Sequence, residues 1–276
     1  MKNRFAIAVV VCLLMAARAE AQFRVVEPAA GENFHVEAGL MFWTPTPTVQ
    51  LQTGSLAALG QPAVDLVGEF GIQSTRFNEF RSVIKGGSKH KLRFSHITMQ
   101  YNQAATLQRT ITFGGSTFPV SVPATADLKW EFWRLGYEYD FVAAPRGVLG
   151  MITELKVNKV AATLAANGYP SSVTDVSAPI PAIGFTARAY PHRLFSITTE
   201  FTGFKLPGFI GKKINDAVQD DFDAKMYDFD LYGTISFTRY IGVQTGYRRV
   251  IAEYLIDPDS GDLKMSGMYF GALLRF

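Results

Sequence analysis

The chain has 276 residues, with 27 basic and 24 acidic side chains and a single cysteine. This near balance of charge leaves no basic stripe of the kind that binds nucleic acid, so we expect no nucleic-acid partner. The sequence is rich in aromatic residues, but beyond its N-terminus no apolar run approaches the roughly 18 residues of a membrane-spanning helix.

The N-terminus has the pattern of a secretory signal peptide. A basic start precedes an apolar run from Phe5 to Ala17, and the small residues Ala19 and Ala21 form the predicted cleavage site. The run is too short to cross a bilayer, which takes roughly 20 residues. Cys12 lies in this segment, so we expect the exported chain to contain no disulfide. We predict three parts: a signal peptide at 1–21, a periplasmic tail at 22–33 and one folded domain at 34–276.

Apolar and polar residues alternate along most of the remaining chain, which is the period of a β-strand. Between Leu128 and Phe141, for example, Trp133 and Leu135 share one face and Arg134 lies on the other. Because a sheet can cross a bilayer only as a closed barrel, we predict an all-β fold, a closed antiparallel transmembrane β-barrel. A soluble β-sandwich is the alternative, but it needs no apolar band on its outside. The candidate strands lie near 34–43, 77–85, 90–103, 126–142, 147–164, 180–190, 194–204, 224–238, 240–256 and 262–276.

The connections between these strands support a count of ten. Bacterial outer-membrane barrels have short periplasmic turns, long extracellular loops and an even number of strands. We therefore expect ten strands, with 8 or 12 as the alternative counts. The predicted turns lie near 86–89, 143–146, 191–193 and 239, and they alternate with loops near 44–76, 104–125, 165–179, 205–223 and 257–261.

The chain ends in YFGALLRF, with apolar residues at every second position behind Phe276. Together with Tyr269, Gly271 and Leu274, this ending resembles the C-terminal signal of bacterial outer-membrane β-barrel proteins, which the barrel-insertion machinery recognises. Stretches such as GYEYDF and SGDLKMSGMYFG make the mature chain similar to a small, porin-like outer-membrane barrel of an uncharacterised family. The resemblance implies a location in the cell outer membrane of a Gram-negative envelope. It also implies outer-membrane lipid, lipopolysaccharide and the insertion machinery as partners.

Many charged residues fall on the polar face of the predicted strands, and we expect them in the lumen. One interpretation is a selectivity or substrate site inside a narrow pore, and the other is a structural plug of salt bridges. Eight strands leave just enough room for side chains, whereas 16 to 18 leave a water channel, so a ten-stranded barrel favours the plug. The predicted lumen charges are Arg134, Glu138, Asp140, Glu154, Lys156, Arg188, Glu200, Asp228, Asp230, Arg248 and Arg275.

Catalytic arrangements of outer-membrane barrels fit this sequence poorly. The omptin proteases use an aspartate–histidine pair with further acids at the extracellular rim, but His35, His90 and His192 fall at the predicted periplasmic end. Lipid A-modifying barrels use histidine and serine near an acid, but Ser95 and His96 are adjacent in a strand and point to opposite faces. We therefore predict no catalytic site and expect His96 to be a hydrogen-bonding residue of the lumen.

No cofactor and no metal site are predicted. The acidic segment Asp257–Asp262 breaks the spacing of a calcium loop, and no phosphate loop, zinc spacing or dinucleotide fingerprint occurs. Two loops are expected to have structure of their own. A short helix around 64–70 is expected to cap or constrict the mouth of the lumen, and a hairpin is expected at 109–120.

The sequence favours a non-enzymatic outer-membrane barrel, either structural or a narrow porin-like path for small solutes. The alternative is a surface binding or adhesion barrel that acts through the predicted loops 44–76 and 104–125. A lipid A-modifying enzyme is the weaker third hypothesis, and no oligomeric state is predicted.

Overall fold

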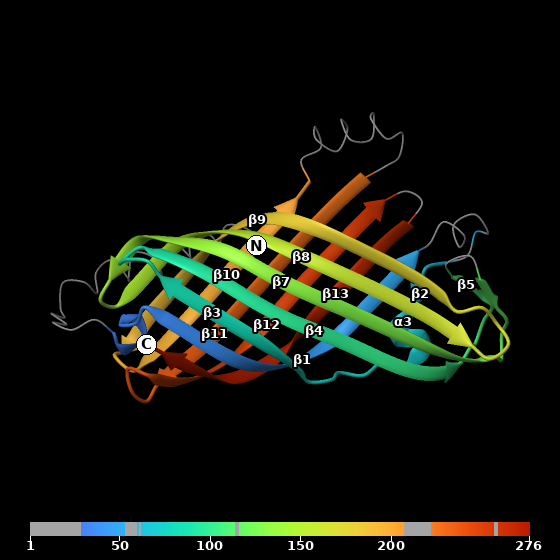
Figure 1. Cartoon of the computed structure of the whole chain (residues 1–276), viewed down its shortest axis with the longest axis horizontal. Coiled ribbons are helices and arrows are strands. Elements are labelled where there is room, and N and C mark those ends of the chain that lie inside the picture. Colours follow the sequence, from blue (N-terminus) through green and yellow to red (C-terminus); the bar gives the residue numbers. More distant parts are fainter. Residues whose placement is uncertain (1–28, 53–59, 61, 114–115, 207–221, 257–258) are drawn as a thin grey trace, which may run out of the picture.

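Ten long antiparallel strands form a closed barrel in the computed structural model (Figure 1). Each strand pairs with the next barrel strand along the chain, and β13 pairs with β1 to close the ring. The prediction of a closed ten-stranded barrel is therefore confirmed. The strands are β1 Val36–Gln52, β3 Phe77–Lys85, β4 His90–Thr106, β7 Pro123–Ala144, β8 Gly147–Ala166, β9 Ser172–His192, β10 Phe195–Lys205, β11 Phe222–Ser236, β12 Ile241–Ile256 and β13 Asp259–Arg275.

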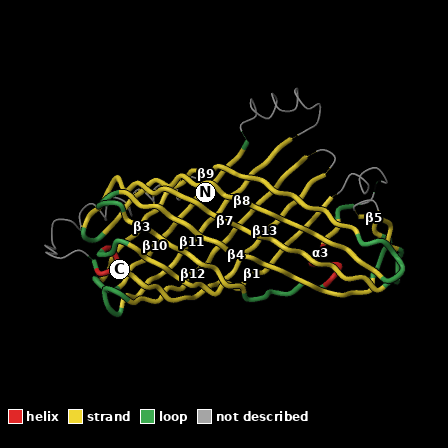
Figure 2. The backbone as a smooth tube through the Cα atoms, in the orientation of Figure 1, coloured by secondary structure: helices red, strands yellow, loops and turns green. Residues whose placement is uncertain are grey.

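The barrel has a turn end and a loop end (Figure 2). Short turns after β3, β7, β9 and β11 lie at the turn end, together with Phe276, and the other connections lie at the loop end. β13 begins at Asp259, so the loop predicted near 257–261 was wrong over its last three residues. Within the described part of the chain, no helix has the length and apolar character needed to cross a membrane. The predicted signal peptide lies outside the described residues, which are 29–52, 60, 62–113, 116–206, 222–256 and 259–276.

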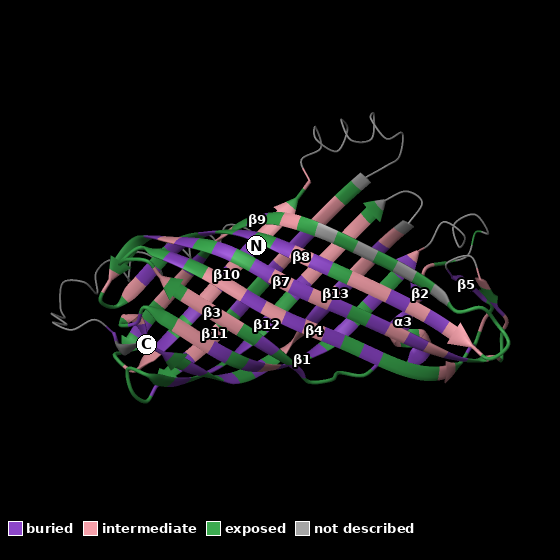
Figure 3. Cartoon of the chain, viewed as in Figure 1, coloured by how far each residue is buried: buried purple, intermediate pink, exposed green. Residues whose placement is uncertain are grey.

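The strands alternate between inward and outward side chains along most of their length, but the polarity of the two faces reverses about halfway. Figure 3 shows the alternation of buried and exposed residues. On β7, Lys129 points outward and Trp130 inward near the loop end, whereas Leu135 points outward and Arg134 inward near the turn end. We call the half with an apolar exterior and a charged interior the membrane section. The half with a polar exterior and an apolar interior is the outer section.

The exterior of the membrane section is an apolar band that runs around the barrel. Such a band is what lipid-facing positions of a transmembrane barrel require. The band therefore places the membrane around the half of the barrel at the turn end. Its exposed side chains include Leu40, Phe80, Leu92, Leu135, Met151, Leu155, Ile183, Phe185, Ile197, Leu231, Ile235, Val243, Met268, Phe270 and Leu274.

Two strands are longer than the sequence indicated. β1 continues to Gln52 and β9 begins at Ser172, so the expected loops 44–76 and 165–179 were wrong over these stretches. In the extension of β1, Val49 is buried and Thr48 is exposed, which is the alternation of a strand. The prediction failed because the exterior of the outer section is polar and both stretches contain proline, features that are typical of loops.

In both strands, a pair of prolines lies along a free edge. Among the described residues, β1 pairs with β3 only as far as Trp43, and β9 pairs with β10 only from Ile183 onward. The long strands of the outer section therefore form two four-stranded sheets, β4-β7-β8-β9 and β11-β12-β13-β1. Proline lacks an N–H group, so it is tolerated at a sheet edge and blocks further pairing there. The prolines are Pro45 and Pro47 in β1 and Pro179 and Pro181 in β9.

The outer section encloses an apolar core, which two short elements help to close. The strand β2 Val64–Asp65 leads into the helix α3 Leu66–Phe70, whose first N–H groups donate to the Asp65 carboxylate at 3.0 and 3.1 Å. Leu66 and Phe70 are buried in the same apolar cluster as Leu128 and Trp130 of β7. The short helix predicted around 64–70 is therefore confirmed, and it covers the core between the two sheets.

The second element is a hairpin of β5 Ile111–Phe113 and β6 Ser116–Phe118, also as predicted. Its apolar side chains join the core, and Arg109 ahead of it binds Glu69 of α3 at 2.7 Å. The helix and the hairpin are thus linked to each other at the loop end.

Candidate functional site

The lumen of the membrane section holds a network of ion pairs in which the two signs of charge are equal in number. Every member has an oppositely charged partner within 3.2 Å. The nine cations are Arg81, Lys85, Lys91, Arg93, Arg134, Lys156, Arg188, Arg248 and Arg275, and the nine carboxylates are Glu32, Glu37, Glu79, Glu138, Asp140, Glu154, Glu200, Asp228 and Asp230. Because these charges cancel, this network presents no net fixed charge to a passing ion.

All eleven charges expected in the lumen lie on the inward face of the barrel. The sequence analysis missed the other seven members of the network. Lys91 and Arg93 lie four and two residues before Ser95 and therefore on the same inward face of β4, so the alternation in this strand could have identified them. Glu79 and Arg81 were harder to find because β3 alternates poorly, and Glu32 lies ahead of the first strand.

Arg248 is the centre of the network and is fully buried. Its guanidinium donates two hydrogen bonds to Asp228, at 3.0 and 2.8 Å, and one to Glu79 at 2.8 Å. It also lies between the rings of Trp43 and Phe132, with centroid distances of 5.3 and 5.6 Å. The carboxylates accept the hydrogen bonds of the guanidinium, and the aromatic rings add cation–π contacts.

A second group of contacts links β7 to β8, and β8 to β10 and β11. Arg134 of β7 donates to Glu154 of β8 at 2.6 and 3.3 Å. Lys156 of β8 donates to the Thr202 hydroxyl of β10 at 2.7 Å and to Asp228 of β11 at 3.2 Å. The bonds of Lys156 reach past β9 through part of the lumen, so they occupy space through which a solute would pass.

Closer to the turn end, Lys91 and Arg93 of β4 hold three carboxylates. Lys91 contacts Glu138 at 3.0 Å and Asp140 at 2.8 Å, and Arg93 contacts Glu138 at 2.7 Å and Glu200 at 2.5 Å. On the opposite side of the network, towards the loop end, the lumen is filled by the apolar core of the outer section. The lumen is therefore occupied at both levels by side chains.

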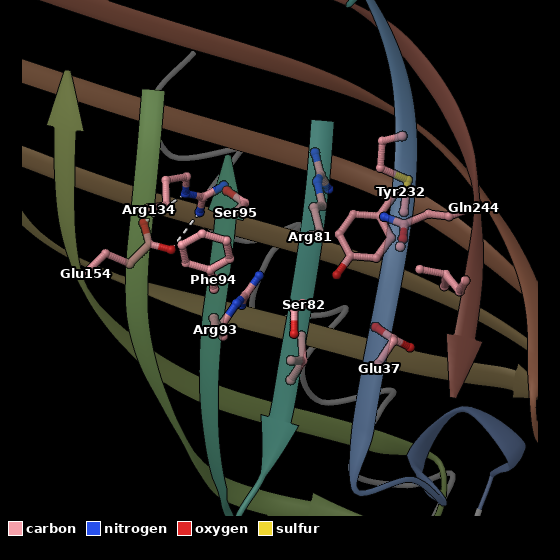
Figure 4. Close-up of a pocket in the computed structure, with 14 residues that line it drawn as sticks. Glu37, Arg81, Ser82, Arg93, Phe94, Ser95, Arg134, Glu154, Tyr232 and Gln244 are labelled. Carbon is pink, nitrogen blue, oxygen red and sulfur yellow. Dashed lines mark hydrogen bonds and ion pairs between the residues drawn. The ribbon is translucent and has the colours of Figure 1, made fainter. Parts of the chain in front are cut away.

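A small cavity remains within the charged layer (Figure 4). Its volume is about 50 Å³, and Arg81, Arg93 and Arg134 line it together with Tyr232 and Gln244. A buried water needs on the order of 10–15 Å³, so this space suits a few water molecules. The buried Nε of Arg81 has no hydrogen-bond partner among the described residues, and such a water would satisfy it.

His96 is not in the lumen, so the expectation of a lumen histidine was wrong. Its neighbour Ser95 faces inward, which places His96 on the exterior at the boundary of the two sections. The imidazole packs against the ring of Trp133 with the centroids 3.8 Å apart and the planes tilted by 33°. Its Nε2 lies 3.5 Å from Thr98 Oγ1 and 3.6 Å from the Glu131 carboxylate. Because the hydroxyl and the carboxylate approach the same nitrogen, this group lacks the base-and-orienter geometry of a catalytic triad.

The remaining three histidines lie at the turn end. His35 precedes β1, His90 begins β4 and accepts or donates a hydrogen bond with Tyr137 at 2.6 Å, and His192 ends β9. In the described ranges, no group of three or more histidine, cysteine or acidic residues is placed to hold a metal ion. The start of the acidic segment Asp257–Asp262 lies outside the described residues.

The residues of the predicted insertion signal divide between the two faces of β13. Tyr269 and Gly271 face the lumen, whereas Leu274 and Phe276 are exposed outside. Tyr269 donates a hydrogen bond to Asp230 at 2.8 Å. Gly271 has no room for a side chain, because a Cβ atom there would lie 2.3 Å from the Leu40 carbonyl oxygen. Recognition of this segment by the insertion machinery stays a prediction.

A closed antiparallel barrel with an even number of strands and an apolar outer band defines the class of transmembrane β-barrels. No protein-family model matches the sequence, and no curated protein does. The structure is similar to that of the outer membrane protease OmpT from Escherichia coli, with a TM-score of 0.55 and 10% identity, over 89% of this chain and 97% of that chain. The protein is an outer-membrane β-barrel protein.

Two further solved structures are similar at lower TM-scores. The translocator domain of the autotransporter NalP from Neisseria meningitidis has a TM-score of 0.42 and 9% identity, over 98% of this chain and 97% of that chain. The attachment invasion locus protein Ail of Yersinia pestis, in complex with the heparin analogue sucrose octasulfate, has a TM-score of 0.39 and 11% identity, over 88% of this chain and 99% of that chain.

Proposed function

We propose that this protein is a non-enzymatic outer-membrane barrel with a closed lumen, and that it binds ligands through the outer section on the cell surface. The observation that carries this proposal is the reversal of polarity along the strands. The membrane section has the exterior of a membrane protein, whereas the outer section has the polar exterior and apolar core of a water-soluble fold.

The filled lumen supports the closed-barrel part of this proposal. Eighteen charges of balanced sign cross-link the membrane section, and the apolar core fills the outer section. A narrow porin-like path, which the sequence also allowed, is less favoured because the cavity between the lumen arginines is only about 50 Å³.

The positions of the histidines support the non-enzymatic part. All four histidines of the chain lie in the described ranges, three at the turn end and His96 on the exterior. A histidine-dependent site at the outer rim, as in the omptin proteases, would need one there. On the exterior, His96 meets Thr98 and Glu131 through one nitrogen only.

A groove of about 300 Å³ on the outer section is the candidate binding surface. One row across four strands consists of Gln50, Asp262, Glu253 and Lys225, each opposite the next in the strand pairing. Amides, carboxylates and an ammonium supply both donors and acceptors, which suits a polyhydroxylated ligand. Since acids outnumber cations in the groove, neutral saccharides and amino sugars fit it better than sulfated ones.

Binding of the refolded protein to immobilised oligosaccharides tests this proposal. We expect binding to neutral or amino-sugar probes, and we expect the double variant Glu253→Gln, Asp262→Asn to reduce it at least tenfold. Asp127→Asn is the matched control, because it makes the same change on the outer face of the opposite sheet. Equal binding by the groove variant, a preference for sulfated probes, or no binding to any probe would contradict the assignment.

A further inference from the structure

The segment ahead of β1 folds across the turn end of the lumen. It contains the short 3₁₀ turn Ala30–Glu32, and Ala29 and Phe34 on either side of it are buried. Gly31 packs so closely on Tyr190 that a Cβ atom there would lie 3.1 Å from the phenol oxygen. In an outer-membrane barrel the short turns face the periplasm, so this segment closes the periplasmic mouth.

Glu32 is the residue through which this segment binds the barrel. Its carboxylate accepts hydrogen bonds from Arg188 at 2.5 Å, Tyr190 at 2.7 Å and Lys85 at 3.1 Å, and it lies 3.7 Å from the Lys91 ammonium. Lys85 also donates to the Glu32 backbone carbonyl at 2.8 Å. The Glu32 side chain is only 12% exposed, so these contacts replace nearly all of its water.

The groups that hold Glu32 belong to the barrel, and two of them, Lys91 and Arg188, have further partners there. They come from three different strands: Lys85 from β3, Lys91 from β4, and Arg188 and Tyr190 from β9. Lys91 is fixed by Glu138 and Asp140, and the Arg188 Nε donates to the Thr198 hydroxyl at 3.1 Å. Three cations and a phenol of the barrel thus converge on one carboxylate. This carboxylate belongs to the segment ahead of β1 and not to a strand.

The electrostatics of this site favour an anion strongly. Burial alone would raise the pKa of Glu32, but the attraction of Arg188, Lys91 and Lys85 and the hydrogen bond from Tyr190 outweigh it and lower that pKa far below its ordinary value. Without Glu32, the lumen network would contain nine cations and eight carboxylates, so the mouth would have an uncompensated positive charge.

We propose that the periplasmic mouth of the barrel is a carboxylate-binding site, that Glu32 is its tethered ligand, and that a small carboxylate takes the place of this side chain when it is absent or withdrawn. This site is separate from the groove of the proposed function and lies at the opposite end of the molecule. A periplasmic molecule that presents a carboxylate competes with Glu32 for it.

Chemical rescue tests the site with acetate as the probe. Glu32→Ala deletes Cγ, Cδ and both carboxylate oxygens, and these are the same four heavy atoms that acetate contains. We compare the mature protein and its variants by the temperature at which the folded barrel loses its faster gel mobility, in sodium acetate and in sodium chloride at equal ionic strength. We expect Glu32→Ala to lower this midpoint by several degrees in chloride, and we expect acetate to restore at least half of the loss.

Two variants serve as controls. Glu32→Ala, Arg188→Met lacks the residue with the shortest bond to the carboxylate, so acetate should restore nothing. Glu37→Ala deletes the same four atoms at the same end, but Glu37 meets one cation, Arg275 at 2.5 Å, so acetate should act weakly. If Glu32→Ala refolds only in acetate, the recovered yield replaces the midpoint as the readout. Equal rescue by chloride, equal rescue of the double variant, or no destabilisation by Glu32→Ala would overturn the proposal.

Discussion

Arg248 shows most clearly how single residues hold this barrel together. Its charge lies at the boundary of the two sections, where carboxylates meet its edges and aromatic rings meet its faces. Removing one partner of a buried ion pair costs more than the pair contributes, because the other charge stays buried without compensation. Arg248 neutralises Asp228 and Glu79 at once, so its loss affects two carboxylates.

We expect Arg248→Met to lower the free energy of unfolding by about 3–5 kcal/mol, since methionine keeps the volume and removes the charge. Urea unfolding of the refolded barrel in lipid or detergent measures this loss. Arg249→Met is the matched control, because Arg249 is the next residue along β12 and is exposed outside. We expect that variant to change stability by about 0.5 kcal/mol or less. Similar losses in the two variants would contradict a network centred on Arg248.

At the scale of single elements, β7 contains the two environments of the molecule in one continuous strand. Lys129 and Leu135 both point outward, but one lies in the outer section and the other in the membrane section. They are six residues, or roughly 20 Å, apart along the strand. The mature chain predicted from the sequence has no cysteine, so single thiols can be placed at either position.

We expect Lys129→Cys in reconstituted vesicles to react with a charged, water-soluble thiol reagent at nearly the rate of a free peptide thiol. Leu135→Cys should react at least tenfold more slowly, because lipid covers it. A fluorophore attached at position 135, but not at position 129, should be quenched by nitroxide-labelled lipids. Equal protection of the two thiols would show that the polarity reversal does not mark the membrane boundary.

The same strands explain how far the sequence could predict the fold. Alternation between apolar and polar residues gave the number of barrel strands and their inward faces, because a one-residue shift would move every side chain to the wrong side. It underestimated β1 and β9, because prolines in strands are rare away from sheet edges and edges cannot be identified before the pairing is known. Two prolines separated by one residue, within an alternating stretch, were the available signal.

The lumen was less predictable than the strands. Alternation placed Arg134, Glu154 and the other predicted charges inside, but it could not pair them, because some partners lie on neighbouring strands and others do not. Asp228 of β11, for example, contacts Arg248 of the next strand and also Lys156 of β8. The alternation along strands could not place Glu32, because this residue lies ahead of β1 and reaches the lumen from outside the sheet. His96 was predicted in the lumen, although it is next to Ser95 in the strand and therefore points to the opposite face.

The whole molecule is a barrel in which one half faces lipid and the other half faces water. In the membrane section the polar groups are inside, where ion pairs of balanced charge satisfy them. In the outer section the apolar groups are inside, where burial stabilises them as in a soluble protein. Side chains occupy both interiors, so we expect no path for solutes through the barrel.

Single-channel recording in a planar bilayer tests this central claim most directly. The refolded mature protein is compared with Arg134→Gln and Glu154→Gln, which each remove one member of a lumen ion pair, after gel mobility has confirmed folding. We expect a silent bilayer for the unmodified protein, and silence also for both variants because the apolar core still closes the outer section. Steady openings of the unmodified protein, with an ion selectivity that changes in the two variants, would contradict it and establish a pore with its filter in the lumen.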